Sequence, residues 1–167
     1  ALRARLEESL AAEAARGTLE DAAIAQSVEQ ARALWRIRES IPEAQFSNVK
    51  HDVSVPVSRV PDLLDALGKA IGKAFPGAPV YAFGHVGDGN IHYNVGSAAL
   101  IARRQEVNRV VYDAVSALGG SISAEHGLGQ LKREEIRQHK DPLELELMRT
   151  LKRALDPEGL MNPGKVL

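Results

Sequence analysis

The order of apolar and polar residues predicts helices that alternate with strands along most of the chain. Residues 1–15 are rich in Ala, Leu, Glu and Arg and are expected to form a helix that ends at Gly17. Thr18 is the expected N-cap of a second helix, which runs up to Pro42. Between Asn48 and Val57 valines alternate with polar residues, which is typical of a half-buried strand. Further helices are expected over residues 61–75, 101–118, 129–138 and 142–155, and a short strand over residues 121–124.

The stretch from Val80 to Val95 predicts a β-hairpin, because Asp88-Gly89 is a frequent two-residue hairpin loop. In that register His85 lies directly opposite His92, and opposed residues share a sheet face with Cβ atoms about 5 Å apart. Asn94 returns to the same face. The other face is apolar and carries Val80, Ala82, Val86, Ile91, Tyr93 and Val95. Since a hairpin requires antiparallel pairing, we expect an α+β fold with an antiparallel sheet and helices packed on one face.

Two opposed imidazoles can chelate one metal ion, and a further ligand is expected from Glu125-His126, where neighbouring glycines allow a tight turn. A set of two histidines and one carboxylate with open positions is used by catalytic zinc and iron(II) sites. These residues alone do not decide between two interpretations: a metal site of this kind, and histidines that only form hydrogen bonds within the fold. His51 falls on the valine face and His139 in a charged surface stretch, so neither is expected to carry chemistry.

Composition excludes several classes of protein. A chain of 167 residues, 44% hydrophobic with a net charge of −1, suits one globular domain and lacks the positive charge of a nucleic-acid binder. No apolar run approaches the roughly 20 residues of a membrane span. The absence of cysteine excludes disulfides and thiolate sites. The segment Gly159–Lys165 resembles a phosphate-binding loop but has Val166 in place of Ser or Thr, so no nucleotide site is expected.

Three segments, GHVGDGNIHYNV, AEHGLG and LDPEGLMNPGKVL, resemble the C-terminal domain of FAD-linked D-2-hydroxy-acid dehydrogenases. This family includes D-lactate dehydrogenases, D-2-hydroxyglutarate dehydrogenase and the glycolate oxidase flavin subunit, and the similarity covers roughly residues 31–167. The resemblance implies that residues 1–167 form a ferredoxin-like cap domain, which holds a small 2-hydroxy acid over the flavin. FAD would be bound mainly by an N-terminal domain absent from this chain. The chain starts at Ala1 within a helical pattern, so we expect an inactive piece of a larger, cytoplasmic enzyme.

The resemblance also implies roles for single residues. His85, His92 and Glu125 match the ligands of a divalent metal, expected to be zinc, with manganese or iron as alternatives. His126 matches a residue at the substrate and is the expected general base. Arg38, Lys50 and Asn94 match substrate-binding groups, and Asn162 matches a residue near the flavin. Where the hydroxyglutarate enzymes have a substrate-contacting threonine this chain has Pro42, which argues against a dicarboxylate substrate.

The implied reaction is oxidation of a D-2-hydroxy acid to a 2-oxo acid. A metal ion on the hydroxyl would lower its pKa, His126 would accept the proton, and the flavin would accept hydride from Cα. Two alternatives remain open: a metal-dependent hydrolase, and a non-catalytic interaction domain with structural histidines. The electron acceptor is not predicted. An exposed sheet edge favours a homodimer as a further possibility.

Overall fold

The computed structural model describes residues 2–41, 43, 47–85 and 87–167 and divides into two compact units, Ala1–Phe46 and Ser47–Leu167. The first unit contains α1 (Leu2–Ala15) and α2 (Val28–Ser40). The predicted N-cap of α2 is wrong: Ser27 caps it and accepts a hydrogen bond from the Gln30 N–H at 3.2 Å. Thr18 instead closes α1, because its hydroxyl donates to the Glu13 carbonyl at 2.9 Å. Pro42 lies outside the described residues.

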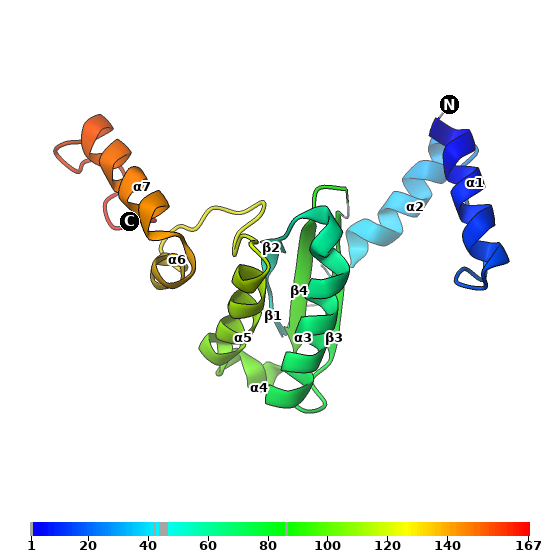
Figure 1. Cartoon of the computed structure of the whole chain (residues 1–167), viewed down its shortest axis with the longest axis horizontal. Coiled ribbons are helices and arrows are strands. Elements are labelled where there is room, and N and C mark those ends of the chain that lie inside the picture. The colour runs from blue at the N-terminus through cyan, green and yellow to red at the C-terminus, as the bar shows by residue number, and fades with distance from the viewer. Residues whose placement is uncertain (1, 42, 44–46, 86) are drawn as a thin grey trace. The chain divides into compact units, whose positions relative to one another are not determined.

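The second unit is built on an antiparallel sheet whose central strand is β4 (Asn90–Gly96). One edge of β4 pairs with β3 (Val80–His85), and the other pairs with β1 (Asn48–Val49) and β2 (Asp52–Ser54) (Figure 1). The predicted strand at residues 121–124 is reduced to a bridge between Ser54 and Ser121. The resulting order of strand, helix, two strands, helix and bridge is that of a ferredoxin-like fold. The expected antiparallel α+β architecture is confirmed.

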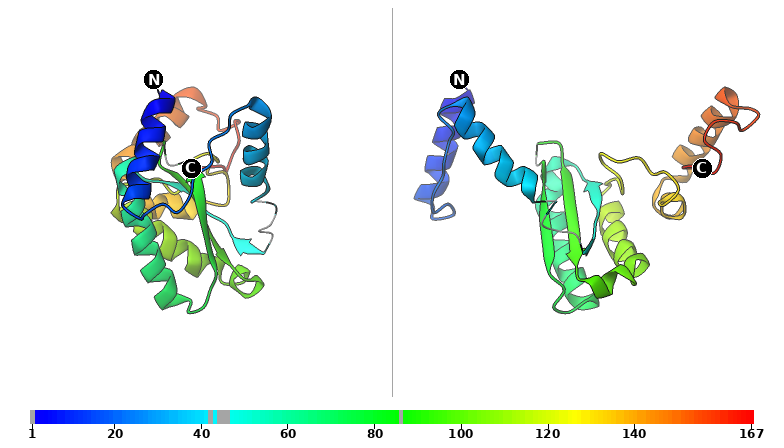
Figure 2. Two further views of the ribbon diagram at one scale, coloured as in Figure 1. Left: turned by 90° about the vertical axis from the view of Figure 1, so that its right-hand side faces the viewer. Right: turned by 180° about the vertical axis from the view of Figure 1, so that it is seen from behind.

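Two helices, α3 (Val60–Ala74) and α5 (Arg104–Ala117), cover one face of this sheet (Figure 2). Pro61 lies in the first turn of α3, as expected, because a helix needs no N–H donor there. The remaining helical segments are η1 (Val57–Arg59), α4 (Ala98–Ile101), α6 (Arg133–His139) and α7 (Pro142–Leu155). The core between helices and sheet includes Val53, Leu63, Leu67, Ile71, Ile91, Tyr93, Val95, Val107, Val111 and Val115. Valine alternation ends at Val55, since Val57 is 47% exposed at the start of η1.

His51 divides the predicted strand into β1 and β2. Its ring Nδ1 lies 2.8 Å from the Tyr93 carbonyl oxygen, and its backbone N–H donates to Asn94 Oδ1 at 3.4 Å. The imidazole therefore takes the carbonyl that an uninterrupted ladder would use. Pairing nevertheless keeps one register, with Val49 opposite Val95 and Asp52 opposite His92. His51 is 2% exposed, which confirms its place on the valine face.

The hairpin has a longer loop than predicted. His85 pairs with Asn90, and His92 pairs with Phe83, so the two histidines are diagonal neighbours rather than directly opposed. The turn closes early because the Asp88 N–H donates to the His85 carbonyl at 3.2 Å, and Asp88 Oδ1 accepts from the Asn90 N–H at 3.0 Å. A slip of two residues leaves every side chain on its predicted face, since the strand repeat is two residues. Val86, assigned above to the apolar face, lies outside the described residues.

Candidate functional site

The three predicted metal ligands come together on the sheet face opposite the helices. The Glu125 carboxylate lies between two imidazoles: its Oε1 is 3.5 Å from His85 Nδ1, and its Oε2 is 3.8 Å from His92 Nε2. The hairpin supplies both histidines, whereas Glu125 comes from the segment that follows the Ser121 bridge. Glu125 is far from the two histidines in sequence, so only the tertiary fold brings the three side chains together.

Asp52 is a fourth member of this group that the sequence analysis did not include among the site residues. One ligand atom each from Asp52, His92 and Glu125 lie within 4.8 Å of one another. Asp52 Oδ2 accepts the backbone N–H of Glu125 at 2.8 Å and that of His126 at 2.9 Å. Asp52 Oδ1 lies 3.9 Å from His92 Nδ1.

The donor set fits a divalent cation. Two carboxylates and two imidazoles face one small region, and such groups are the oxygen and nitrogen ligands that zinc, manganese and iron accept in proteins. Carboxylates held this close repel each other unless a positive charge lies near them. Asp52 Oδ1 is buried and has no hydrogen-bond partner among the described residues, which is costly for a carboxylate oxygen. This group therefore suits a metal ion both in chemistry and in charge, although the ligand atoms within 4.8 Å of one another belong to Asp52, His92 and Glu125, and the predicted ligand His85 approaches them through Glu125.

Three other predicted residues belong to the same unit. His126 follows Glu125 directly and is exposed, and its backbone N–H donates to the Asp52 carboxylate. Asn94 lies two residues after His92 on β4 and is buried, where its Oδ1 accepts the His51 N–H. Lys50 is exposed between β1 and β2, and the shared register of these strands places it level with Asn94.

The remaining two predicted residues come from other segments of the chain. Arg38 is half-buried near the end of α2 in the first unit. Asn162 is exposed in the C-terminal turn and has a left-handed backbone with φ of 49°. This turn returns to the chain just after the Glu125-His126 segment, because the Val166 N–H donates to the Gly129 carbonyl at 2.8 Å.

Sequence reasoning missed the polar groups that hold the Glu125-His126 turn. Lys132 Nζ donates to the Ile122 carbonyl at 2.8 Å and to Ser123 Oγ at 3.1 Å, and Ser123 Oγ donates to the His126 carbonyl. Partial burial lowers the pKa of Lys132. The expectation that His139 lies on the surface is also wrong: its side chain is 9% exposed, packed edge-on against Tyr112. The only sequence signal for Asp52 was its place on the polar side of a valine-rich strand.

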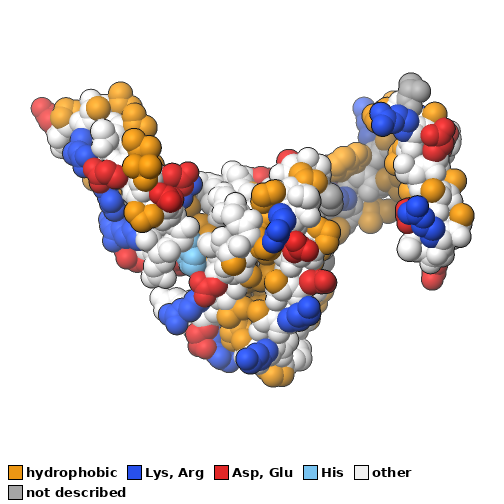
Figure 3. Space-filling view, in the orientation of Figure 1, with side chains coloured by type: hydrophobic (Ala, Val, Ile, Leu, Met, Phe, Trp, Pro, Cys, Tyr) orange, Lys and Arg blue, Asp and Glu red, His pale blue; other side chains and the backbone are white. Residues whose placement is uncertain are grey.

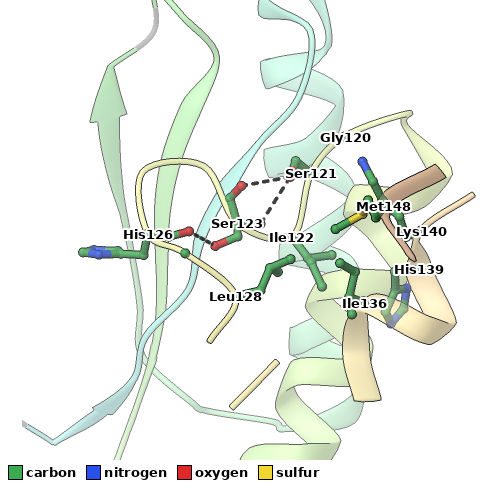
Figure 4. Close-up of a pocket in the computed structure, with 11 residues that line it drawn as sticks. Gly120, Ser121, Ile122, Ser123, His126, Leu128, Ile136, His139, Lys140 and Met148 are labelled. Atoms are coloured by element: carbon green, nitrogen blue, oxygen red, sulfur yellow. Dashed lines mark hydrogen bonds between the residues drawn. The ribbon is translucent and has the colours of Figure 1, made fainter. Parts of the chain in front are cut away.

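A cavity of about 380 Å³ lies beside this turn (Figure 4). It is bounded by the segment from Gly120 to Leu128, by α6 and by Met148 of α7. Figure 4 shows the His126 imidazole pointing away from the cavity. His126 belongs to the lining of this cavity, whereas His85, His92 and Glu125 are not among the lining residues described.

Comparison with known proteins identifies relatives along nearly the whole chain. A D-2-hydroxyglutarate dehydrogenase of Stutzerimonas stutzeri is 37% identical over 158 residues, covering 90% of this chain and 34% of the relative. The mitochondrial D-2-hydroxyglutarate dehydrogenase of Arabidopsis thaliana is 40% identical over 169 residues, covering 99% and 30%. That of Bos taurus, also mitochondrial, is 38% identical over 155 residues, covering 90% and 28%. The chain spans about a third of the length of these relatives.

The family profile described as "FAD linked oxidases, C-terminal domain" matches residues 1–166. The match includes both the histidine-bearing hairpin and the Glu125-His126 turn. The antiparallel sheet with helices on one face agrees with it. This chain therefore belongs to the family of FAD-linked oxidase C-terminal domains.

Proposed function

We propose that this chain is the substrate- and metal-binding part of an FAD-dependent dehydrogenase that oxidises a D-2-hydroxy acid to a 2-oxo acid. The observation that carries the proposal is the approach of His85 and His92 to one carboxylate, that of Glu125, directly before His126. Its relatives are D-2-hydroxyglutarate dehydrogenases, which favours redox chemistry over the hydrolase alternative. Hydrolysis of an ester or amide by the chain alone would contradict this choice.

Each site residue has a distinct role in this proposal. When bound, FAD supplies the hydride acceptor and a divalent metal lowers the pKa of the substrate hydroxyl. His85, His92 and Glu125 hold the metal, and the His126 imidazole accepts the hydroxyl proton. Arg38 and Lys50 bind the substrate carboxylate, bidentate in the case of arginine. Asn94 orients the substrate hydroxyl from the histidine face of β4, and Asn162 contacts the flavin.

The names of the relatives make D-2-hydroxyglutarate, a dicarboxylate, the first substrate to test. Pro42 argues instead for a monocarboxylate substrate. The experiment compares D-2-hydroxyglutarate, D-lactate and glycolate with an artificial electron acceptor, using the longer flavin-containing protein that includes this chain. Oxidation of a D-2-hydroxy acid is expected from that protein and none from the isolated chain, which has no flavin acceptor. Turnover by the isolated chain, or none by the flavin-containing protein, would overturn the proposal.

Metal binding is expected to stabilise the isolated chain. Zn²⁺ at 100 times its dissociation constant should raise the free energy of unfolding by about 2.7 kcal/mol, because it binds only the folded state. Urea denaturation with Zn²⁺, with Mn²⁺ and with a chelator measures the effect. The matched variants are Glu125→Gln, which removes the shared carboxylate, and Glu134→Gln, which removes an exposed carboxylate of α6. Only Glu125→Gln should abolish the gain, and an equal gain in both variants would exclude this metal site.

A leucine stripe on α7 supports docking of a flavin-binding part from outside this chain. Four leucines spaced by four residues lie on one exposed side of the helix, and hydrophobic side chains gather along it in Figure 3: Leu143, Leu147, Leu151 and Leu155. In contrast, Leu145 of the same helix is buried. Contiguous exposed apolar surface of this kind marks an interface. Since the relatives are about three times longer, we assign the stripe to their additional, flavin-binding part.

The stripe gives a prediction that compares two contexts. Leu147→Gln should change the stability of the isolated chain by no more than about 0.5 kcal/mol, because Leu147 is 56% exposed. In the flavin-containing protein the same change should lower the melting temperature, because it places an amide in an apolar contact. Differential scanning calorimetry of both proteins makes the comparison, with Glu158→Gln beyond α7 as the control. Equal effects in the two contexts would rule out an interface on this side of α7.

A further inference from the structure

We propose that Asp52 is the positioning residue of this site, because its carboxylate accepts two N–H groups of the Glu125-His126 turn and also faces the His92 ring at 3.9 Å. Its Oδ2 would orient the turn and its Oδ1 would orient the imidazole. Its effect on metal affinity rests on the proposed function, whereas its contact with the turn does not.

The contact with the turn is a two-point clamp. Asp52 Oδ2 accepts from two successive backbone N–H groups, those of Glu125 and His126, at 2.8 and 2.9 Å. The Asp52 carbonyl also accepts the Ala124 N–H at 3.2 Å. Hydrogen bonds from amides to an ionised carboxylate are stronger than neutral ones. Two side chains with different proposed roles, a metal ligand and a base, are thus oriented by one oxygen atom.

The two ring nitrogens of His92 face two different carboxylates. Nε2 faces the Glu125 carboxylate at 3.8 Å, and Nδ1 faces Asp52 Oδ1 at 3.9 Å. A histidine that binds a metal through one ring nitrogen commonly donates the N–H of the other to a carboxylate. The strand register places Asp52 directly opposite His92, and its Oδ1 has no other partner among the described residues. Asp52 Oδ1 is therefore free to accept this N–H after a small approach.

Burial makes this carboxylate a rigid support. Asp52 is 7% exposed, between β4 and the turn, so its geometry is held by packing on both sides. Lys132 and Ser123 hold the same turn through the Ile122 and His126 carbonyls. Asp52 thus links the hairpin half of the site to the backbone of the Glu125 half.

The test uses nuclear magnetic resonance and metal titration of the 167-residue chain. Asp52→Asn keeps the shape of the side chain but replaces its charge. Without metal, the amide protons of Glu125 and His126 should shift upfield while those of α3 and α5 stay unchanged. With Zn²⁺, the dissociation constant should rise about 10- to 100-fold, the usual effect of replacing such a supporting carboxylate.

The matched control is Asp156→Asn. Asp156 is also 7% exposed and also accepts two backbone N–H groups, those of Leu160 at 2.8 Å and Met161 at 2.9 Å. Its replacement should shift those two amides and leave Zn²⁺ affinity unchanged. An equal loss of affinity in both variants would overturn the positioning role.

Two further measurements test the proposal, and the first of them does not need a folded Asp52→Asn variant. In the wild-type chain, scalar coupling across the hydrogen bonds should connect the Glu125 and His126 amides to the Asp52 carboxyl carbon, and its absence would overturn the clamp. In folded Asp52→Asn, the visible absorption bands of bound Co²⁺ should match those of wild type. A changed spectrum would make Asp52 a metal ligand and contradict a positioning role. A wild-type chain that binds neither Zn²⁺ nor Co²⁺ would contradict the proposed metal site. The coupling to the Glu125 and His126 amides would still test whether Asp52 holds the turn.

Discussion

Replacement of His126 by asparagine in the flavin-containing longer protein is expected to lower kcat by about 10²- to 10⁴-fold, the usual contribution of a general base. The reason is local: asparagine keeps the backbone contact to Asp52 but has no group that can accept the substrate proton at neutral pH. Flavin content should be unchanged, because His126 is exposed on a turn of this chain and not in a nucleotide site. Steady-state kinetics and the flavin absorption spectrum measure the two quantities.

His139→Asn is the matched control for this experiment. His139 belongs to α6, where its Nδ1 lies 3.2 Å from Ser116 Oγ and its ring packs against Tyr112. This substitution should leave kcat within a factor of a few of the wild-type value. Near-normal turnover in His126→Asn would exclude its role as proton acceptor, and the other proposed roles would stand unaffected.

The stability of the chain is expected to fall by about 3 kcal/mol as the pH is lowered from 6.5 to 4, because of His51 alone. Burial lowers the pKa of His51 from 6.5 to about 4, and Lys132 and Arg104 add to this effect. Hydrogen bonds to the Tyr93 carbonyl and to Asn108 act in the opposite direction but are smaller. In this range the unfolded chain binds a proton that the folded chain does not, so stability is complete above pH 6.5 and is lost toward pH 4.

Urea denaturation as a function of pH measures this loss, with His51→Gln as the reference. Glutamine does not titrate, so the difference between the two proteins removes the effect of carboxylates that protonate in the same range. The variant is expected to be less stable than wild type at pH 7 but to have a flatter profile from pH 6.5 to 4. Parallel profiles would show that His51 is not buried in its neutral form.

Much of the fold could be predicted from local pattern. Helical periodicity located α3, α5 and α7, because this signal depends on residues within a few positions of each other. Strand alternation separated the histidine face of the hairpin from its apolar face. That separation survived the wrong loop length, since a slip of two residues does not change the face.

Particular side-chain contacts that the hydrophobic pattern does not show explain the errors. Ser27 rather than Thr18 caps α2 because the Ser27 side chain, not that of Thr18, meets the Gln30 N–H. His51 interrupts a strand that alternates without a break in sequence, because its ring reaches the Tyr93 carbonyl 42 residues away. His139 appeared to be a surface residue among charges, but contact with Tyr112 of α5 buries it.

The candidate site shows the same division. The hairpin pattern placed two imidazoles on one polar face and Glu125-His126 in a glycine-rich turn, which left a metal site and structural histidines equally open until the family resemblance was added. The partner of the Glu125-His126 turn was not readable, because Asp52 lies 73 residues before Glu125 and only the packed sheet brings them to 2.8 Å. A contact of that range depends on how distant segments pack, and its energy appears only once the chain has folded.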